Sequence, residues 1–120
     1  MKAINNNMTK ELRLPLKTQW FEMTKAGIKK EDYREITTYW CSRLCKHWFP
    51  SGSENPLDWL IKYKTFTENV MTLGYPKSTD TSRIIKLEHK GIEIGYGKEE
   101  WGAEPNKLYF IIKHGNIINQ

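Results

Sequence analysis

The spacing of apolar residues changes period within the first 30 residues of this 120-residue chain. Leu12, Leu14 and Leu16 alternate with polar residues, which is the pattern of a half-buried strand. Between residues 16 and 27 the apolar spacing becomes four, three and four, which marks one face of a helix, and Gly27 suits its C-terminal end. A period of 2 followed so soon by a period near 3.6 predicts an α+β fold.

A short charged strand and a second helix are predicted next. Lys30, Asp32 and Arg34 share one parity, so a strand would project all three from the same face. Apolar residues then recur at every fourth position, at Ile36, Trp40, Leu44 and Trp48. This spacing predicts a second helix, which ends before the turn-rich loop of residues 50–57.

The remainder of the chain predicts strands. The candidates are residues 65–73, 83–95 and 107–113. Within the second of them the apolar positions change from odd to even numbers, so a bulge is expected near Lys90 and Gly91. We find no repeat and no long linker in the sequence. We therefore predict one domain that folds alone and contains a curled or closed sheet.

The composition favours a globular protein outside the membrane. Hydrophobic residues make up 38% of the chain and aromatic residues 12%, which is too many for a disordered chain. The apolar runs are only strand-sized and the N-terminus lacks a signal-peptide core, so we expect a cytoplasmic monomer. Cys41 and Cys45 should then stay as thiols, and with His47 they lack a fourth zinc ligand. We therefore expect neither a metal nor a cofactor.

Positive charge is concentrated in the first half of the sequence. The net charge is +5, and residues 1–50 hold 10 Lys and Arg against 5 Asp and Glu, whereas residues 51–120 hold 9 of each. A basic excess attracts phosphate groups and makes binding depend on salt. The charge distribution therefore favours a nucleic-acid partner, although it also occurs in domains without one.

Residues 27–34, Gly-Ile-Lys-Lys-Glu-Asp-Tyr-Arg, resemble the Gly-x-Lys-x-x-(acidic or Thr)-x-Arg signature of ASCH domains. They follow a predicted strand and helix, as they do in that family, and the likeness covers about residues 10–115. Segments 14–17, 90–97 and 101–103 are similar to bacterial and phage members. The resemblance implies a PUA-like small β-barrel of about five to six strands with two or three flanking helices. Outside this domain we expect residues 1–9 to form a flexible leader and residues 116–120 a short tail.

The resemblance also implies a role with nucleic acid, because PUA-like relatives mostly recognise RNA or modified bases. We therefore predict binding of single-stranded RNA or a modified nucleotide in a basic cleft beside the signature, with a role in RNA processing or regulation. One alternative is a hydrolase, either a ribonuclease or an amidohydrolase that acts on acylated cytidine. A second alternative is a protein-interaction adaptor that uses a surface rich in tryptophan.

Five residues are candidates for binding nucleic acid. Lys29, Lys30 and Arg34 could clamp phosphate groups, with Arg34 giving a two-pronged hydrogen bond. Tyr33 lies between charges on the signature strand, and Trp101 lies in a polar segment of the kind that often carries function. Both rings could stack on bases.

Each of these features also has a structural interpretation. The basic signature could be a solvated turn closed by a salt bridge between Asp32 and Arg34. Trp101 could form a lid on the end of the barrel. Trp20 and Trp40 match the apolar stripes of the two predicted helices, so we expect them to pack in the core.

Catalysis would depend on Lys29. In the amidase-like members that the signature resembles, the working residues are a Lys, a Thr three residues later and a Glu from a late strand. Lys29 matches the Lys, Asp32 stands at the Thr position, and Glu88 or Glu93 could supply the late carboxylate. Desolvation in a cleft could allow Lys29 to act as a base. An ionised Asp32 cannot replace a hydroxyl nucleophile, which favours binding over catalysis.

Overall fold

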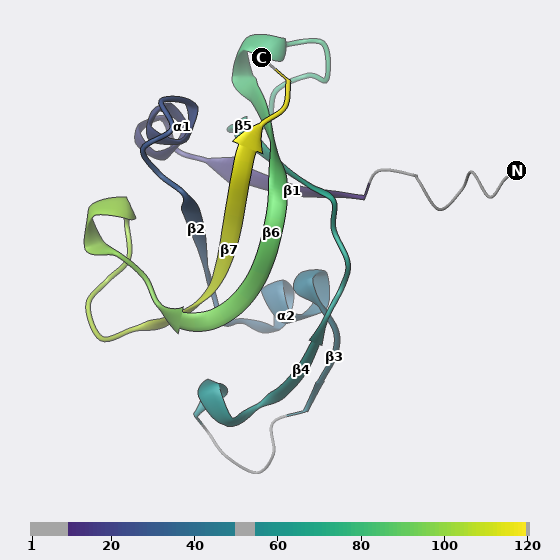
Figure 1. The fold of residues 1–120 in the computed structure, drawn as a ribbon, viewed down its shortest axis with the longest axis vertical. Coiled ribbons are helices and arrows are strands. Elements are labelled where there is room, and N and C mark those ends of the chain that lie inside the picture. The colour runs from purple at the N-terminus through teal and green to yellow at the C-terminus, as the bar shows by residue number, and fades with distance from the viewer. Residues whose placement is uncertain (1–9, 50–54, 120) are drawn as a thin grey trace, which may run out of the picture. The chain divides into compact units, whose positions relative to one another are not determined.

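The computed structural model describes residues 10–49 and 55–119 (Figure 1). Its strands are β1 (Glu11–Leu16), β2 (Glu31–Glu35), β3 (Cys45–Phe49), β4 (Leu60–Tyr63), β5 (Glu68–Leu73), β6 (Ile84–Tyr96) and β7 (Leu108–Ile117). Its α-helices are α1 (Thr18–Lys25) and α2 (Thr38–Leu44), and its 3-10 helices are η2 (Pro56–Asp58), η3 (Thr81–Arg83) and η4 (Glu99–Trp101). Within these residues, no helix is both long enough and apolar enough to span a membrane.

Five strands form one sheet in the order β1-β5-β6-β7-β2, and β3 and β4 form a separate pair. β1 is parallel to β5, whereas the β5–β6 and β2–β7 pairs are antiparallel. Figure 1 shows the two longest strands, β6 and β7, side by side. The α+β prediction is confirmed. No closed barrel is found in the described parts of the chain, so the PUA-like barrel stays a prediction.

The first strand and the first helix lie where the change of period predicts them. Leu12 and Leu14 of β1 are buried, whereas Glu11 and Arg13, which alternate with them, are exposed. Helix α1 has its C-cap at Ala26 and is followed by Gly27 at φ +77°. That left-handed conformation is costly for residues with a Cβ atom, which explains a glycine at the helix end.

The prediction of a second helix that continues to Trp48 is wrong at its C-terminal end. Helix α2 ends at Leu44, because Cys45 has extended backbone angles (φ −109°, ψ 133°) and opens β3. β3 is antiparallel to β4, a strand that the sequence pattern missed. Pairing with β4 therefore overrides the helical spacing that continues to residue 48. Of the predicted loop 50–57, residues 50–54 lie outside the described residues, and Pro56 begins η2.

The later strands match the predictions except at their ends. β6 continues without a break through Gly91, whose φ of +116° is one that glycine adopts readily, and the bulge near Lys90 and Gly91 stays a prediction. β7 continues to Ile117, and the Ile118 amide donates to the Lys86 carbonyl at 2.8 Å. Residues 116–118 are therefore tied to the sheet and are not the tail that the sequence predicted. The predicted leader, residues 1–9, lies outside the described residues.

The chain divides into two units. Unit 1 contains the residues up to 28, residues 65–89 and the residues from 115 onward, and unit 2 contains residues 29–64 and 90–114. The core of unit 1 includes Leu12, Leu14, Phe21, Val70, Met71, Ile85 and Leu87. The core of unit 2 includes Cys41, Leu44, Cys45, Phe110, Ile111 and Ile112. Residues 29–34 of the ASCH-like signature lie in unit 2.

Candidate nucleic-acid interface

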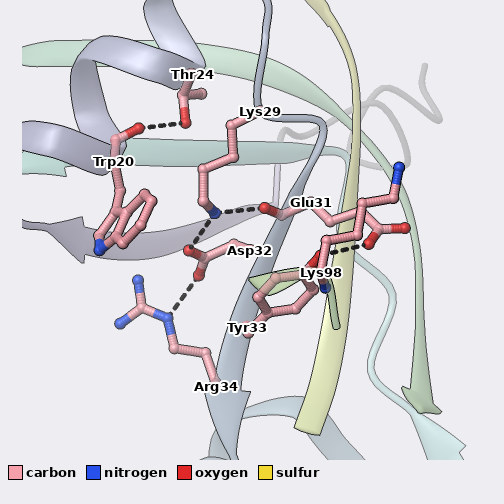
Figure 2. A network of polar contacts seen from close by, with 8 residues as sticks. All are labelled: Trp20, Thr24, Lys29, Glu31, Asp32, Tyr33, Arg34 and Lys98. Atoms are coloured by element: carbon pink, nitrogen blue, oxygen red, sulfur yellow. Dashed lines mark hydrogen bonds and ion pairs between the residues drawn. The ribbon is translucent and has the colours of Figure 1, made fainter. Parts of the chain in front are cut away.

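The signature segment buries an ion pair. Lys29 and Asp32 are each only 3% exposed, and Lys29 Nζ lies 3.4 Å from Asp32 Oδ1 (Figure 2). The Lys29 ammonium also donates to the backbone carbonyl of Glu31. Asp32 reaches this position because β2 pairs with β7, where its partner in register is the fully buried Ile112. The two charges are thus held in surroundings where water contributes little.

Arg34 binds the second oxygen of the same carboxylate. It lies two residues after Asp32 on β2, so both side chains project from one face, and Arg34 Nε is 2.6 Å from Asp32 Oδ2. Burial raises the pKa of Asp32, but Arg34 and Lys29 outweigh it and hold that pKa below its usual value. Burial lowers the pKa of the Lys29 ammonium, and Asp32 opposes this only in part. Asp32 therefore stays ionised, while Lys29 loses its proton more easily than an exposed lysine.

Arg34 also contacts an aromatic group at the start of α2. Its Cζ lies 4.9 Å from the centre of the Trp40 ring, and Arg43 Cζ lies 5.6 Å from the same centre. Tyr39, 60% exposed, meets Trp40 edge-on at 5.2 Å and lies 5.8 Å from Arg43 Cζ. The Thr37 hydroxyl caps α2 by accepting from the Trp40 amide at 3.2 Å, which fixes where the helix starts. We call Arg34, Tyr39, Trp40 and Arg43 the arginine–aromatic cluster.

Tyr33 points to the other face of β2 and is held at both its ring and its hydroxyl. The hydroxyl donates to Glu31 Oε1 at 2.8 Å and accepts from the Lys98 amide at 3.0 Å. The ring lies 5.8 Å from the Tyr109 ring, and a Cβ atom at Gly97 would lie only 2.7 Å from it. Burial raises the pKa of Tyr33. These contacts make Tyr33 a packed residue of unit 2.

The other two predicted binding residues lie at different places. Lys30 is exposed, and its carbonyl accepts from the His114 amide at 3.0 Å. Trp101 is half-buried on η4, with Lys98 Nζ 4.4 Å from the centre of its ring. Lys98 thus connects Trp101 with Tyr33. The structure brings Lys29 and Arg34 together on one carboxylate, and Tyr33 and Trp101 together around Lys98. Lys29 Nζ also lies 5.3 Å from the centre of the Tyr33 ring.

The predicted catalytic glutamates have their own partners. Glu93 is exposed and lies 2.6 Å from Lys113 Nζ. Glu88 belongs to unit 1, where it accepts from the Asn116 amide at 2.9 Å. The carboxylate that the structure brings to Lys29 is that of Asp32. No group of three or more His, Cys, Asp or Glu residues suited to a metal ion occurs within residues 10–49 and 55–119.

The chain was compared with protein-family models, with curated proteins and with solved structures. None of these comparisons found a match. The likeness to ASCH domains therefore depends on residues 27–34 and the segments around them.

Sequence reasoning missed part of the arginine–aromatic cluster. Trp20 and Trp40 are half-buried, so the prediction that both pack in the core is corrected. The physical reason for Trp40 is that its ring packs against the guanidinium groups of Arg34 and Arg43, which are themselves only half-buried residues. Arg43 follows Trp40 by three residues on α2, which is a spacing that brings helical side chains together. That spacing is a signal that could have identified Arg43.

Proposed function

We propose that this chain binds single-stranded RNA or a nucleotide through the arginine–aromatic cluster. The observation that carries the proposal is that two guanidinium groups, of Arg34 and Arg43, lie on one half-buried tryptophan beside the exposed Tyr39. Guanidinium groups pair with phosphates and stack on rings. Aromatic side chains stack on bases, which contributes about 1–3 kcal/mol per base. Proteins that bind single strands combine these two kinds of group.

The buried ion pairs support this proposal because they organise Arg34. Asp32 accepts from its Nε at 2.6 Å, so the guanidinium plane is anchored to a strand before any ligand arrives. An anchored side chain loses less entropy on binding than one that moves in solvent. Lys29, Arg34 and Arg43 bring three positive charges to this region against the carboxylates of Asp32 and Glu31. The local excess of positive charge attracts phosphate.

The signature and the α+β fold support a finer assignment, which we also propose: an ASCH-type domain with a PUA-like fold that acts in RNA processing or regulation. On this assignment, Lys29, Asp32 and Arg34 are the signature positions. Lys30 is the exposed cation beside them, and it can add a further phosphate contact.

Arg43→Ala and Tyr39→Ala are expected to weaken binding of a short, unstructured RNA. Arg43→Ala removes one phosphate contact, so the slope of log affinity against log salt should become shallower by about 0.7. Tyr39→Ala should cost about 1–3 kcal/mol of binding, with little change in melting temperature because the ring is exposed. Fluorescence anisotropy with a labelled oligonucleotide at several salt concentrations measures both effects.

Arg83→Ala is the matched control for this experiment. Arg83 is an exposed arginine of unit 1, and its side chain is 53% accessible beside Asp80. Its substitution removes the same net charge at another place. If Arg43→Ala and Arg83→Ala have the same affinity and the same salt slope, the cluster does not bind RNA.

A second candidate function is hydrolysis, and the observation that favours it is the lowered pKa of the buried Lys29. A neutral amine can act as a base, whereas arginine keeps its proton at any working pH. If Lys29 is the base, Lys29→Arg abolishes turnover, while the exposed Lys30→Arg retains it. Chromatography of labelled RNA and of acylated cytidine after incubation measures the products. An inactive wild-type protein would exclude this function for these two substrates.

A further inference from the structure

A pocket of about 640 Å³ lies within unit 2, where β2 leads into α2 and where the chain enters β7. It is lined by Glu35, Ile36, Thr37, Pro56, Trp59, Tyr96, Asn106, Lys107 and Leu108. Sites for small ligands usually have volumes of about 300–1,000 Å³. Glu35 follows Arg34 on β2, so the two side chains project to opposite faces of the strand. The pocket is thus separate from the arginine–aromatic cluster.

The walls of the pocket suit a flat ring. Two of the lining residues are the aromatic Trp59 and Tyr96, and Pro56 and Leu108 add apolar surface. Tyr96 is 63% exposed, whereas a tyrosine that serves only for packing is usually more buried. Exposed aromatic side chains in an open pocket can stack on a planar ligand, and the stacking removes the faces of both rings from water.

The charges at the pocket disfavour a phosphate group. Lys107 Nζ lies 2.5 Å from Glu35 Oε2 and 3.2 Å from Glu104 Oε2. One ammonium is therefore shared by two carboxylates, and this group carries a net negative charge. An anionic ligand would be repelled, whereas a neutral ligand with N–H donors would find carboxylate acceptors.

Asn106 supplies a hydrogen-bonding pattern that matches one kind of base. It is the non-glycine residue in the described chain with a positive φ, +60°, and it lines the pocket next to Lys107. An asparagine amide can donate to N7 and accept from the N6 amino group of adenine at the same time. Asparagine also tolerates this backbone conformation better than most residues with a Cβ atom.

We propose that this pocket binds an uncharged nucleoside whose base carries an exocyclic amino group, of the adenine type. Trp59 and Tyr96 provide the stacking surface, while Asn106 and Glu35 recognise the amino edge. The site does not depend on the proposed RNA-binding role of the cluster, because it uses none of the same residues.

Isothermal titration of the full chain with adenosine, inosine and AMP tests the proposal. Adenosine should bind about 10-fold more tightly than inosine, which carries an oxygen in place of the amino group. AMP should bind more weakly than adenosine because of the two carboxylates. Tyr96→Ala should weaken adenosine binding about 10-fold. Asn106→Gly keeps a residue that accepts positive φ but removes the amide, so it should reduce the preference for adenosine over inosine, while Glu35 still accepts from the amino group.

Tyr75→Ala is the matched control, because Tyr75 is a tyrosine of unit 1 that is 91% exposed. It should bind adenosine as the wild type does. The proposal is overturned if folded wild-type protein does not bind adenosine at millimolar concentration, or if Tyr96→Ala binds it unchanged. Equal binding of adenosine and inosine, or a preference for AMP, would overturn the proposed ligand class. Arg43→Ala should leave adenosine binding intact, so a failure here is distinguishable from a failure of RNA binding.

Discussion

Asp32→Ala is expected to lower the free energy of unfolding by about 3–5 kcal/mol. The carboxylate of Asp32 is buried and binds Lys29 through one oxygen and Arg34 through the other. Without it, the 3% exposed Lys29 would have to hold an unpaired charge where water scarcely reaches or give up its proton, and either outcome costs stability. The midpoint of urea denaturation, with an unchanged slope, measures the loss.

Glu93→Ala is the control for this variant. Glu93 also forms an ion pair, at 2.6 Å from Lys113, but its side chain is 55% exposed. An exposed pair contributes about 0–1 kcal/mol, so Glu93→Ala should change stability little. If the two variants lose similar stability, the buried pair is not the stabilising feature described here.

The acid stability of the protein should depend on the same carboxylate. The pKa of Asp32 is lowered below 3.8 in the folded state, so the folded protein binds fewer protons there than the unfolded chain does. The resulting stability is fully present above pH 3.8 and is lost as the pH falls through the folded-state pKa. Asp32→Asn removes the titrating group, so the stability of this variant should fall less steeply in that acid range.

Gly97→Ala is expected to cost about 1–3 kcal/mol of stability. The added Cβ would lie 2.7 Å from Tyr33 Cζ and 2.8 Å from the Ala103 Cβ. The Tyr33 ring cannot easily turn away, because its hydroxyl bonds to Glu31 and to the Lys98 amide. Thermal and urea denaturation of the variant measure the loss.

Gly95→Ala provides the comparison two residues earlier in the chain. Its new Cβ would first meet Ile111 Cδ1 at 3.2 Å, which is the end of a side chain that can move. Its cost should therefore be smaller than that of Gly97→Ala. Equal costs for the two variants would show that the contact with Tyr33 is not the cause.

The sequence predicts elements well where local spacing decides the structure. The first strand and the first helix follow from their apolar periods, and Gly27 marks the helix end by its φ of +77°. The segment after residue 44 keeps a helical spacing but forms a strand, since its partner β4 lies beyond the loop. Spacing within one segment carries no information about such a partner.

In the candidate site, too, local spacing predicts some contacts and leaves others unpredicted. Parity along the signature predicts that Asp32 and Arg34 share a face. The salt bridge between them, which is one interpretation of the sequence, is present in the structure. The contact of Arg34 with Trp40 depends on how the chain turns from β2 into α2 at the Thr37 cap. No residue period describes that turn, so the contact between Arg34 and Trp40 could not be derived from the sequence, whereas the contact between Trp40 and Arg43 follows from their spacing on α2.

The discontinuity of unit 1 has a consequence for the order of folding during synthesis. Its first strand pairs in parallel with β5, and Lys10 bonds to Thr67 across 57 residues. Closing so long a loop is slow compared with forming local contacts. Unit 1 also includes the residues from Gly115 onward, so on the ribosome it cannot be completed until these residues have left the exit tunnel. Residues 29–64 will therefore emerge while β1, which precedes them, still lacks its partner β5.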